Sequence, residues 1–150
     1  MRAATTLLAA CVAASGLGLG AAAADNDSKS APAFHVIVHA HNPSTALDRK
    51  FVADAFLKKT TRWAGDTVIR PVDQKPKSSV RRAFSRAVLK RSVAAVRSYW
   101  RRVVYSGRGV PPPELDGDKE IVDYVRKHRG AIGYVSSGAE LTGVKVVQVK

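Results

Sequence analysis

The sequence predicts a layered α/β domain, and three observations support this fold class. Short apolar runs rich in β-branched residues alternate along the chain with longer segments of helical periodicity. Turn and loop residues, including three successive prolines at 111–113, separate these segments. The chain has 150 residues, which suffice for one domain with a hydrophobic core. We therefore expect a single layered α/β domain over residues 34–150, with a partly parallel sheet.

The expected elements follow from local patterns. The run FHVIVHA is short, apolar and β-branched, as in a strand, whereas the apolar residues after Leu47 recur near a period of 3.6, as in a helix. Ser78 or Ser79 can cap a later helix, Ser92 restarts a helical pattern, and Asp118 can cap another helix. The expected strands cover 34–40, 67–72, 131–135 and 144–149, and the expected helices cover 47–58 and begin at 78 or 79, at 92 and at 118.

Residues 1–24 have the pattern of a secretory signal peptide. A short positive start at Arg2 precedes small and apolar residues, and an A-x-A site precedes Asp25. The run ending at Cys11 also matches a lipobox, but its apolar region is very short, so we favour ordinary cleavage. Cys11 is the only cysteine, so the processed chain would form no disulfide. We expect a disordered linker at 25–33, a periplasmic or secreted location, and no transmembrane span after processing.

The charge of the protein is strongly positive. It has 25 Lys and Arg against 12 Asp and Glu, a formal net charge of +13, which attracts anions at long range without naming a partner. Arginines interleaved with aromatic residues in the central helices resemble a nucleic-acid-binding face. However, Phe84 and Trp100 fall on the apolar stripes of these helices, and no base-reading motif is present. We therefore do not expect nucleic acid as a partner.

The stretch RPVDQKPKSSVRRAF, residues 70–84, is the main candidate site. It leads from a strand through a short loop to a helix start, where backbone N–H groups and the positive end of the helix dipole favour an anion. The hydroxyls of Ser78 and Ser79 and the cations Lys75, Lys77 and Arg81 would suit a tetrahedral oxyanion. The alternative is that one serine simply caps the helix and the cations are ordinary surface residues.

Other chemistry has little support in the sequence. His35, His39 and His41 share one face of an extended strand, so two of them could hold zinc, but no cysteine and few carboxylates lie nearby. No G-x-S-x-G, P-loop or H-E-x-x-H motif occurs. We therefore expect neither a metal site, a cofactor nor an enzyme, and keep the histidines as the alternative metal hypothesis.

Three phrases, in this order and spacing, resemble the phosphate-binding proteins of phosphate ABC importers. They are FLKKTTRW at 56–63, SSVRRAF at 78–84 and GAIGYV at 130–135. The family has a phrase like I-F-x-G-K-x-T-x-W, then a Ser-Gly-Thr helix start, then G-A-I-G-Y-V. The resemblance implies a type II periplasmic-binding-protein fold, in which two α/β lobes clamp a solute. This chain is long enough for one such lobe.

The resemblance implies an anion site at the helix start, but with two departures. The Ser-Gly-Thr turn reads Ser78-Ser79-Val80, which loses a hydroxyl and a flexible glycine, and an arginine expected four residues before the serine is Gln74. An open single lobe would also leave the anion in contact with water. The expected anion-binding residues are Ser78, Ser79, Val80, Arg81, Gln74 and Lys77.

Two functions follow as hypotheses. The first is an exported, non-enzymatic solute-binding-like domain that binds phosphate or a similar oxyanion weakly, with importer membrane subunits as the implied partner. The second is an envelope interaction module that has lost solute binding and docks on acidic partners through basic helices, using residues such as Arg82, Arg86 and Lys90.

Overall fold

The structure is a computed structural model that describes residues 33–150. The expected signal peptide at 1–24, the lipobox at Cys11 and all but the last residue of the expected linker at 25–33 lie outside the described residues. No helix within 33–150 combines the length and the apolar character that crossing a bilayer requires.

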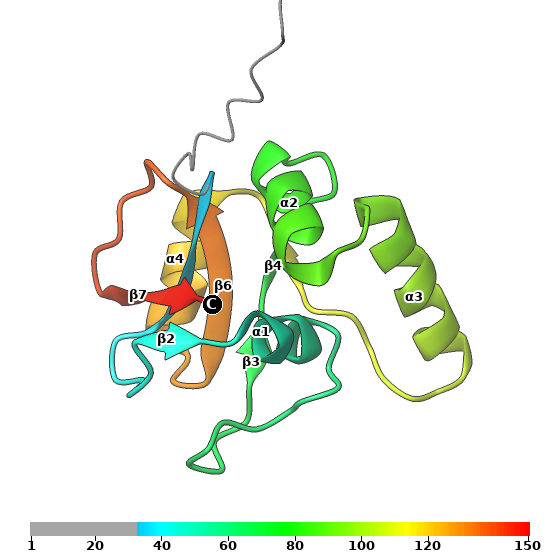
Figure 1. The fold of residues 1–150 in the computed structure, drawn as a ribbon, viewed down its shortest axis with the longest axis horizontal. Coiled ribbons are helices and arrows are strands. Elements are labelled where there is room, and N and C mark those ends of the chain that lie inside the picture. Colours follow the sequence, from blue (N-terminus) through cyan, green and yellow to red (C-terminus); the bar gives the residue numbers. More distant parts are fainter. Residues whose placement is uncertain (1–32) are drawn as a thin grey trace, which may run out of the picture.

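A mixed five-stranded sheet forms the centre of the domain (Figure 1). Its middle strand, β1 (Phe34–His39), pairs antiparallel with β6 (Ala131–Ser136) and with β7 (Val144–Val149). Two short edge strands, β2 (Ala46–Leu47) and β3 (Arg70–Pro71), pair parallel with β7 and β6 respectively. The expectation of a partly parallel sheet is therefore confirmed.

The predicted strand at 67–72 is wrong in its extent. Only β3 joins the main sheet, and β4 (Asp73–Gln74) pairs parallel with β5 (Glu114–Leu115) as a separate two-stranded sheet. The reason is a change of partner: the N–H of Val72 donates to Ile132 of β6, whereas that of Asp73 donates to Pro113. This change directs the chain away from the sheet and towards the next helix.

The helices begin at polar caps. Helix α1 (Arg49–Phe56) begins after Asp48, and α2 (Ser79–Phe84) begins after Ser78 and continues into a π-helical turn, η1 (Ser85–Leu89). Helix α3 (Val93–Tyr105) begins after Ser92, as predicted.

Two predictions about helix ends are wrong. Helix α4 (Asp118–Lys127) has Gly117 as its N-cap, not Asp118. The carboxylate of Asp118 accepts hydrogen bonds from Gln74 and Ser136 instead. Helix α1 is also shorter than the predicted 47–58, because Leu47 pairs in β2.

The sheet is covered by helices on both faces, so the layered α/β fold is confirmed. On one face, Val36 and Val38 of β1 join a core with Phe56, Phe84 and Trp100 from α1, α2 and α3. On the other face, Ile37 packs with Ile121 and Val125 of α4. Figure 1 shows α1 and α2 close to the sheet, while α3 lies at the margin of the domain.

Candidate anion-binding site at the start of α2

Ser78 caps α2, and its hydroxyl is already used twice. Its backbone is extended (φ −61°, ψ 132°), and its Oγ accepts a bond from the N–H of Arg81 at 3.2 Å. The same hydroxyl donates to Oε1 of Gln74 at 2.6 Å. The helix start predicted at Ser78 or Ser79 is therefore confirmed, and the N–H of Arg81, one of the expected anion donors, has another acceptor.

Gln74, which stands where the resemblance leads us to expect an arginine, is only 2% exposed. Its Nε2 donates to Oδ1 of Asp118 at 2.9 Å and to the carbonyl of Tyr134 at 3.2 Å, while its Oε1 accepts from Ser78. Both ends of the amide are therefore satisfied inside the protein. Gln74 links the loop before α2 to α4 and β6 and offers no donor to a ligand.

The guanidinium of Arg81 also points away from the helix start. Its Nη2 lies 3.0 Å from Oδ2 of Asp73 and its Nη1 lies 2.5 Å from Oε1 of Glu114, with the guanidinium almost fully buried. Nη1 also donates to the carbonyl of Gln74. Arg81 therefore links α2 to β4 and β5, and its side chain is not available to hold an anion at the helix start.

Asp73 completes this buried network. Besides Arg81, it accepts bonds from the hydroxyl of Tyr134 and from the N–H of Gln74 at 3.0 Å. Burial raises the pKa of Asp73, and Arg81 and the hydroxyl of Tyr134 act in the opposite direction. Burial and the nearby Asp73 carboxylate likewise raise the pKa of Tyr134 well above its ordinary value. The network thus links β4, β5, β6 and α2 at the loop that leads into α2.

The first turn of α2 borders an open depression of about 750 Å³, and Ser78 and Val80 line it. Within residues 33–150, the N–H groups of Ser79 and Val80 have no acceptor. Val80 lines the depression, together with the exposed cations Lys77 and Arg97. Lys75 also lines it but pairs with Asp116 at 2.5 Å. Of the predicted site residues, Gln74, Lys77, Ser78 and Val80 line this depression, whereas Ser79 does not line it and the side chain of Arg81 points elsewhere.

Asp118 gives the depression an acidic side that the sequence reasoning missed. Its carboxylate accepts from Nε2 of Gln74, from the N–H of Ser136 at 3.0 Å and from the hydroxyl of Ser136. A carboxylate has about four acceptor positions, so one remains. The only signal in the sequence was an acidic residue at a helix start, which we interpreted as a cap.

The histidine alternative gains no support from the structure. The rings of His39 and His41 stack with their centroids 5.2 Å apart. In the described part of the chain, no group of three or more His, Cys, Asp or Glu side chains is placed to hold a metal ion.

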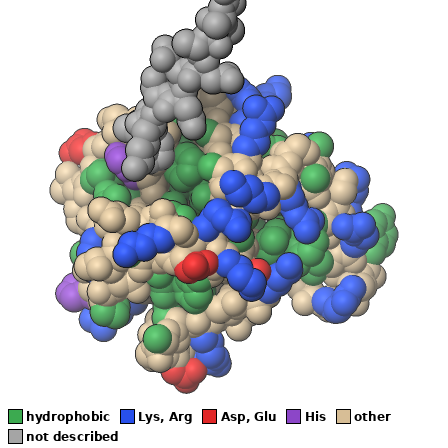
Figure 2. Space-filling view, viewed as in Figure 1, with side chains coloured by type: hydrophobic (Ala, Val, Ile, Leu, Met, Phe, Trp, Pro, Cys, Tyr) green, Lys and Arg blue, Asp and Glu red, His purple; other side chains and the backbone are tan. Residues whose placement is uncertain are grey.

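The segment that contains α2 and α3 is rich in basic residues. Between Lys75 and Pro113 the chain has no acidic residue, and Figure 2 shows many Lys and Arg side chains over α2 and α3. Phe84 and Trp100 are 1% and 6% exposed, so they belong to the core, as predicted, and cannot stack on bases. The basic residues of this segment are Lys75, Lys77, Arg81, Arg82, Arg86, Lys90, Arg91, Arg97, Arg101, Arg102 and Arg108.

Solved structures provide the comparison. A protein from Clostridium perfringens, assigned as a phosphate ABC transporter substrate-binding protein and solved with bound phosphate, matches 78% of this chain with a TM-score of 0.62 and 25% identity. An ABC-type phosphate transport receptor from Vibrio cholerae matches 78% with a TM-score of 0.60 and 19% identity. PstS from Borrelia burgdorferi matches 79% with a TM-score of 0.61 and 11% identity.

The match covers only part of those proteins. This chain spans 44%, 46% and 47% of their respective lengths. No protein-family model and no curated protein matches the sequence. The resemblance inferred from the sequence is nevertheless confirmed at the level of the fold: residues 33–150 form an α/β domain that matches one lobe of the phosphate ABC transporter substrate-binding proteins.

Proposed function

We propose that this chain is an exported, non-enzymatic solute-binding-like domain that binds phosphate or a similar oxyanion weakly at the start of α2. The observation that carries the proposal is a pair of adjacent N–H groups, of Ser79 and Val80, that have no acceptor within residues 33–150, at a helix start whose Val80 lines an open depression. Two adjacent amides at the positive end of a helix are a suitable donor set for one oxyanion.

Weak binding follows from what the site lacks. Neither the side chain of Gln74 nor that of Arg81 can donate to the anion, because both are bonded internally. Lys77 and Arg97 remain as flexible, exposed cations whose attraction is screened by salt. Affinity should therefore fall as the salt concentration rises.

Asp118 suggests a preference among anions. Its remaining acceptor position can accept a hydrogen bond from a protonated anion, whereas a fully deprotonated anion would only be repelled by the carboxylate. Hydrogen phosphate carries such a proton near neutral pH, and sulfate does not. We therefore expect phosphate to bind more tightly than sulfate.

Calorimetric titration with phosphate tests the proposal at low salt. Ser79→Pro removes one free N–H and suits the first position of a helix, where proline is well tolerated and the extended Ser78 can precede it. Ser79→Ala is the matched control, because it removes the same hydroxyl but keeps the N–H. Loss of binding in Ser79→Pro alone supports the amide site, whereas no heat of binding with the unaltered chain refutes it.

A link to phosphate import is part of the same proposal. The compared proteins are described as parts of phosphate ABC transporters, so importer membrane subunits are the natural partners of a bound solute. Co-purification of these subunits with the tagged chain from membranes, enhanced by phosphate, would support the link. Their absence under both conditions would restrict the function to anion binding.

The second candidate is an interaction module that docks on acidic partners. The absence of any acidic residue between Lys75 and Pro113 favours it, as does the internal bonding of Gln74. Changing Arg82, Arg86 and Lys90 to Glu should abolish capture of an acidic envelope partner and leave phosphate binding intact. Capture that survives both this change and moderate salt would argue against the module.

A further inference from the structure

A second concave site lies between α3 and the proline loop that follows it. The cleft has a volume of about 580 Å³ and shares only Arg97 with the depression at α2. The inference is independent of anion binding at α2 and deepens the second candidate function, because it gives the acidic partner a defined docking site. Its lining includes Trp100 and Val104 of α3 and Pro111 and Pro112 of the loop.

Helix α3 presents two rows of side chains to this cleft. Arg97, Arg101 and Tyr105 recur at a spacing of four residues and form one row, and Trp100 and Val104 form an apolar row beside it. Trp100 is 6% exposed, whereas Val104 and Tyr105 are 49% and 91% exposed. The cleft therefore has an apolar wall that is incompletely covered and a cationic rim.

The charges around the cleft favour an anionic occupant. Asp73 and Glu114 also line it and share Arg81 as their partner, so three arginines against two carboxylates give the lining a formal charge of +1. Within residues 33–150, neither Arg97 nor Arg101 pairs with a carboxylate; Arg101 donates only to the hydroxyl of Ser98. The two arginines on the rim are therefore available for external carboxylates.

The length of the rows favours a short peptide over a single small anion. Residues 97 and 105 lie about 12 Å apart along a helix axis, which corresponds to roughly three to four residues of extended chain. Three of the five exposed large apolar side chains of the described residues, Val104, Tyr105 and Val110, lie at this end of the helix. An occupant should therefore combine carboxylates with at least one apolar side chain.

We propose that the cleft between α3 and the proline loop binds an acidic peptide segment of a partner protein, with an apolar side chain inserted between Val104, Tyr105 and Pro111. Carboxylates of the segment pair with Arg97 and Arg101 at the rim.

Fluorescence anisotropy with two labelled peptides tests this, with the complete chain as the binder. One peptide carries a Phe-Leu pair between runs of Glu, and the other carries Ser-Ser in its place. The cleft should bind the first peptide more tightly. Equal affinity for both peptides would overturn the proposal, because it would mean attraction by charge alone.

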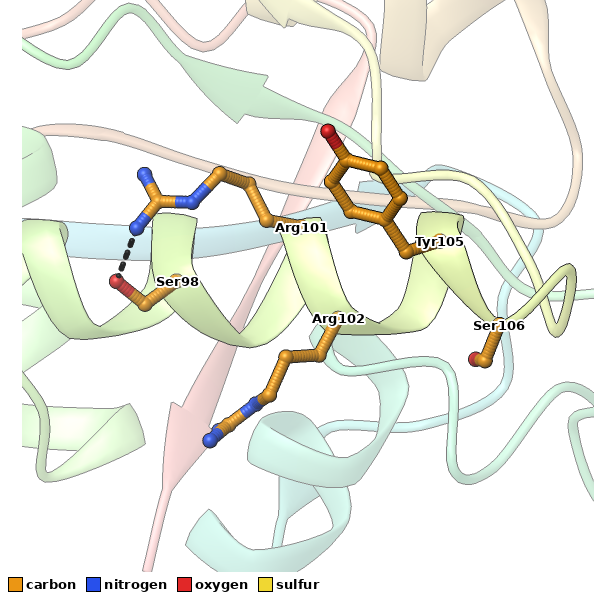
Figure 3. Close-up of a pocket in the computed structure, with 5 residues that line it drawn as sticks. All are labelled: Ser98, Arg101, Arg102, Tyr105 and Ser106. Carbon is orange, nitrogen blue, oxygen red and sulfur yellow. Dashed lines mark hydrogen bonds between the residues drawn. The ribbon is translucent and has the colours of Figure 1, made fainter.

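Two adjacent arginines provide a matched pair of variants. Figure 3, which draws a neighbouring pocket on α3, shows the side chains of Arg101 and Tyr105 on one side of the helix and that of Arg102 on the other. Of these three residues, only Arg101 and Tyr105 also line the cleft. Arg101→Glu and Arg102→Glu change the net charge equally. We expect about a tenfold loss of affinity for Arg101→Glu and about a twofold loss for Arg102→Glu. Equal losses would refute a specific cleft.

Tyr105→Ser tests the apolar wall without disturbing the core, because this side chain is 91% exposed. It should remove the preference for the Phe-Leu peptide. Anionic phospholipid vesicles and single-stranded DNA serve as the other arms. One result would show that the proposal is wrong. In it, the peptides do not bind, the vesicles or the DNA do bind, and Arg101→Glu lowers their affinity more than Arg102→Glu does. The occupant of the cleft would then not be a peptide.

Discussion

Tyr134 connects the sheet to the charged network under the candidate site. It is fully buried, its ring stacks on Phe84 with centroids 4.0 Å apart, and its hydroxyl donates to Asp73. Its hydroxyl also accepts from the N–H of Gln74 at 3.1 Å. A single hydroxyl thus holds β6 and β4 together where the chain leaves the main sheet.

Tyr134→Phe should keep the stacking and lose both hydrogen bonds. Because a buried carboxylate then loses a donor, we expect the free energy of unfolding to fall by about 1–3 kcal/mol. Urea denaturation measures this change. Tyr105→Phe, at an exposed position, is the control and should have almost no effect.

Because of Tyr134, we also expect the free energy of unfolding to depend on pH in the alkaline range. The pKa of Tyr134 is raised above its ordinary value of 10.0, so above that pH the unfolded chain loses a proton that the folded protein retains. The folded state then binds more protons, and the free energy of unfolding falls with rising pH, by about 1.4 kcal/mol per pH unit for one such group. Tyr134→Phe should show a flatter dependence. Parallel curves for the two proteins would contradict this assignment.

At the scale of single residues, the sequence predicts the helix cap Ser78 but not the buried ion pairs of Arg81. Ser78 could be identified from its position before a basic amphipathic helix, because helix caps are local. The ion pairs of Arg81 depend on Asp73 and Glu114, which a tertiary contact brings together across 41 positions of sequence (114 − 73). No local pattern distinguishes such an arginine from a surface arginine.

At the scale of elements, the GAIGYV phrase has a packing explanation. A Cβ at Gly133 would lie 2.8 Å from Ile121 and 3.0 Å from Val72, so this glycine lets α4 rest closely on β6. A Cβ at Gly130 would lie 1.9 Å from the carbonyl oxygen of Val68. Both glycines therefore serve the close approach of neighbouring segments to β6.

Gly130→Ala should be strongly destabilising. The backbone cannot retreat easily, because the carbonyl of Gly130 already accepts bonds from Arg70 and from the indole of Trp63. We expect a loss of at least about 1–3 kcal/mol in thermal or urea unfolding. Gly138→Ala is the control, since a Cβ there meets nothing within 4 Å. An equal effect at both glycines would show that the clash is relieved by a local shift.

The long elements could be predicted from the sequence, and the short ones could not. The strands at 34–39, 131–136 and 144–149 carry enough apolar periodicity to be recognised, as do the main helices. The strands β2, β4 and β5 have two residues each, too few for any period. The π-helical turn at 85–89 also has no signature in the composition of its residues.

At the scale of the whole molecule, stability should be unevenly distributed. Strands β1 and β6 are buried between helices, whereas only Val96 and Trp100 of α3 are buried. We expect the amide hydrogens of α3 to exchange through local opening well before those of β1 and β6. Hydrogen exchange followed by mass spectrometry tests this order. Simultaneous exchange of α3 and the sheet would mean that the domain opens only as a unit.

The resemblance to phosphate-binding proteins predicts the fold of one lobe, and the amino-acid composition predicts its positive charge. Neither predicted the cleft beside α3, because a concave surface depends on where the proline loop returns to the helix. The interpretation of Arg81 as part of an anion site failed to anticipate its burial for the same reason.

The pairing of β1 has a consequence for biosynthesis. This strand begins at Phe34, yet both its neighbours, β6 and β7, come from the final stretch of the chain, ending at Val149. During synthesis β1 therefore stays without its sheet partners until β6 and β7, about 100 residues later in the chain, have emerged from the ribosome. The central sheet therefore cannot assemble before residues 131–149 are available, and until then β1 is accessible to chaperones.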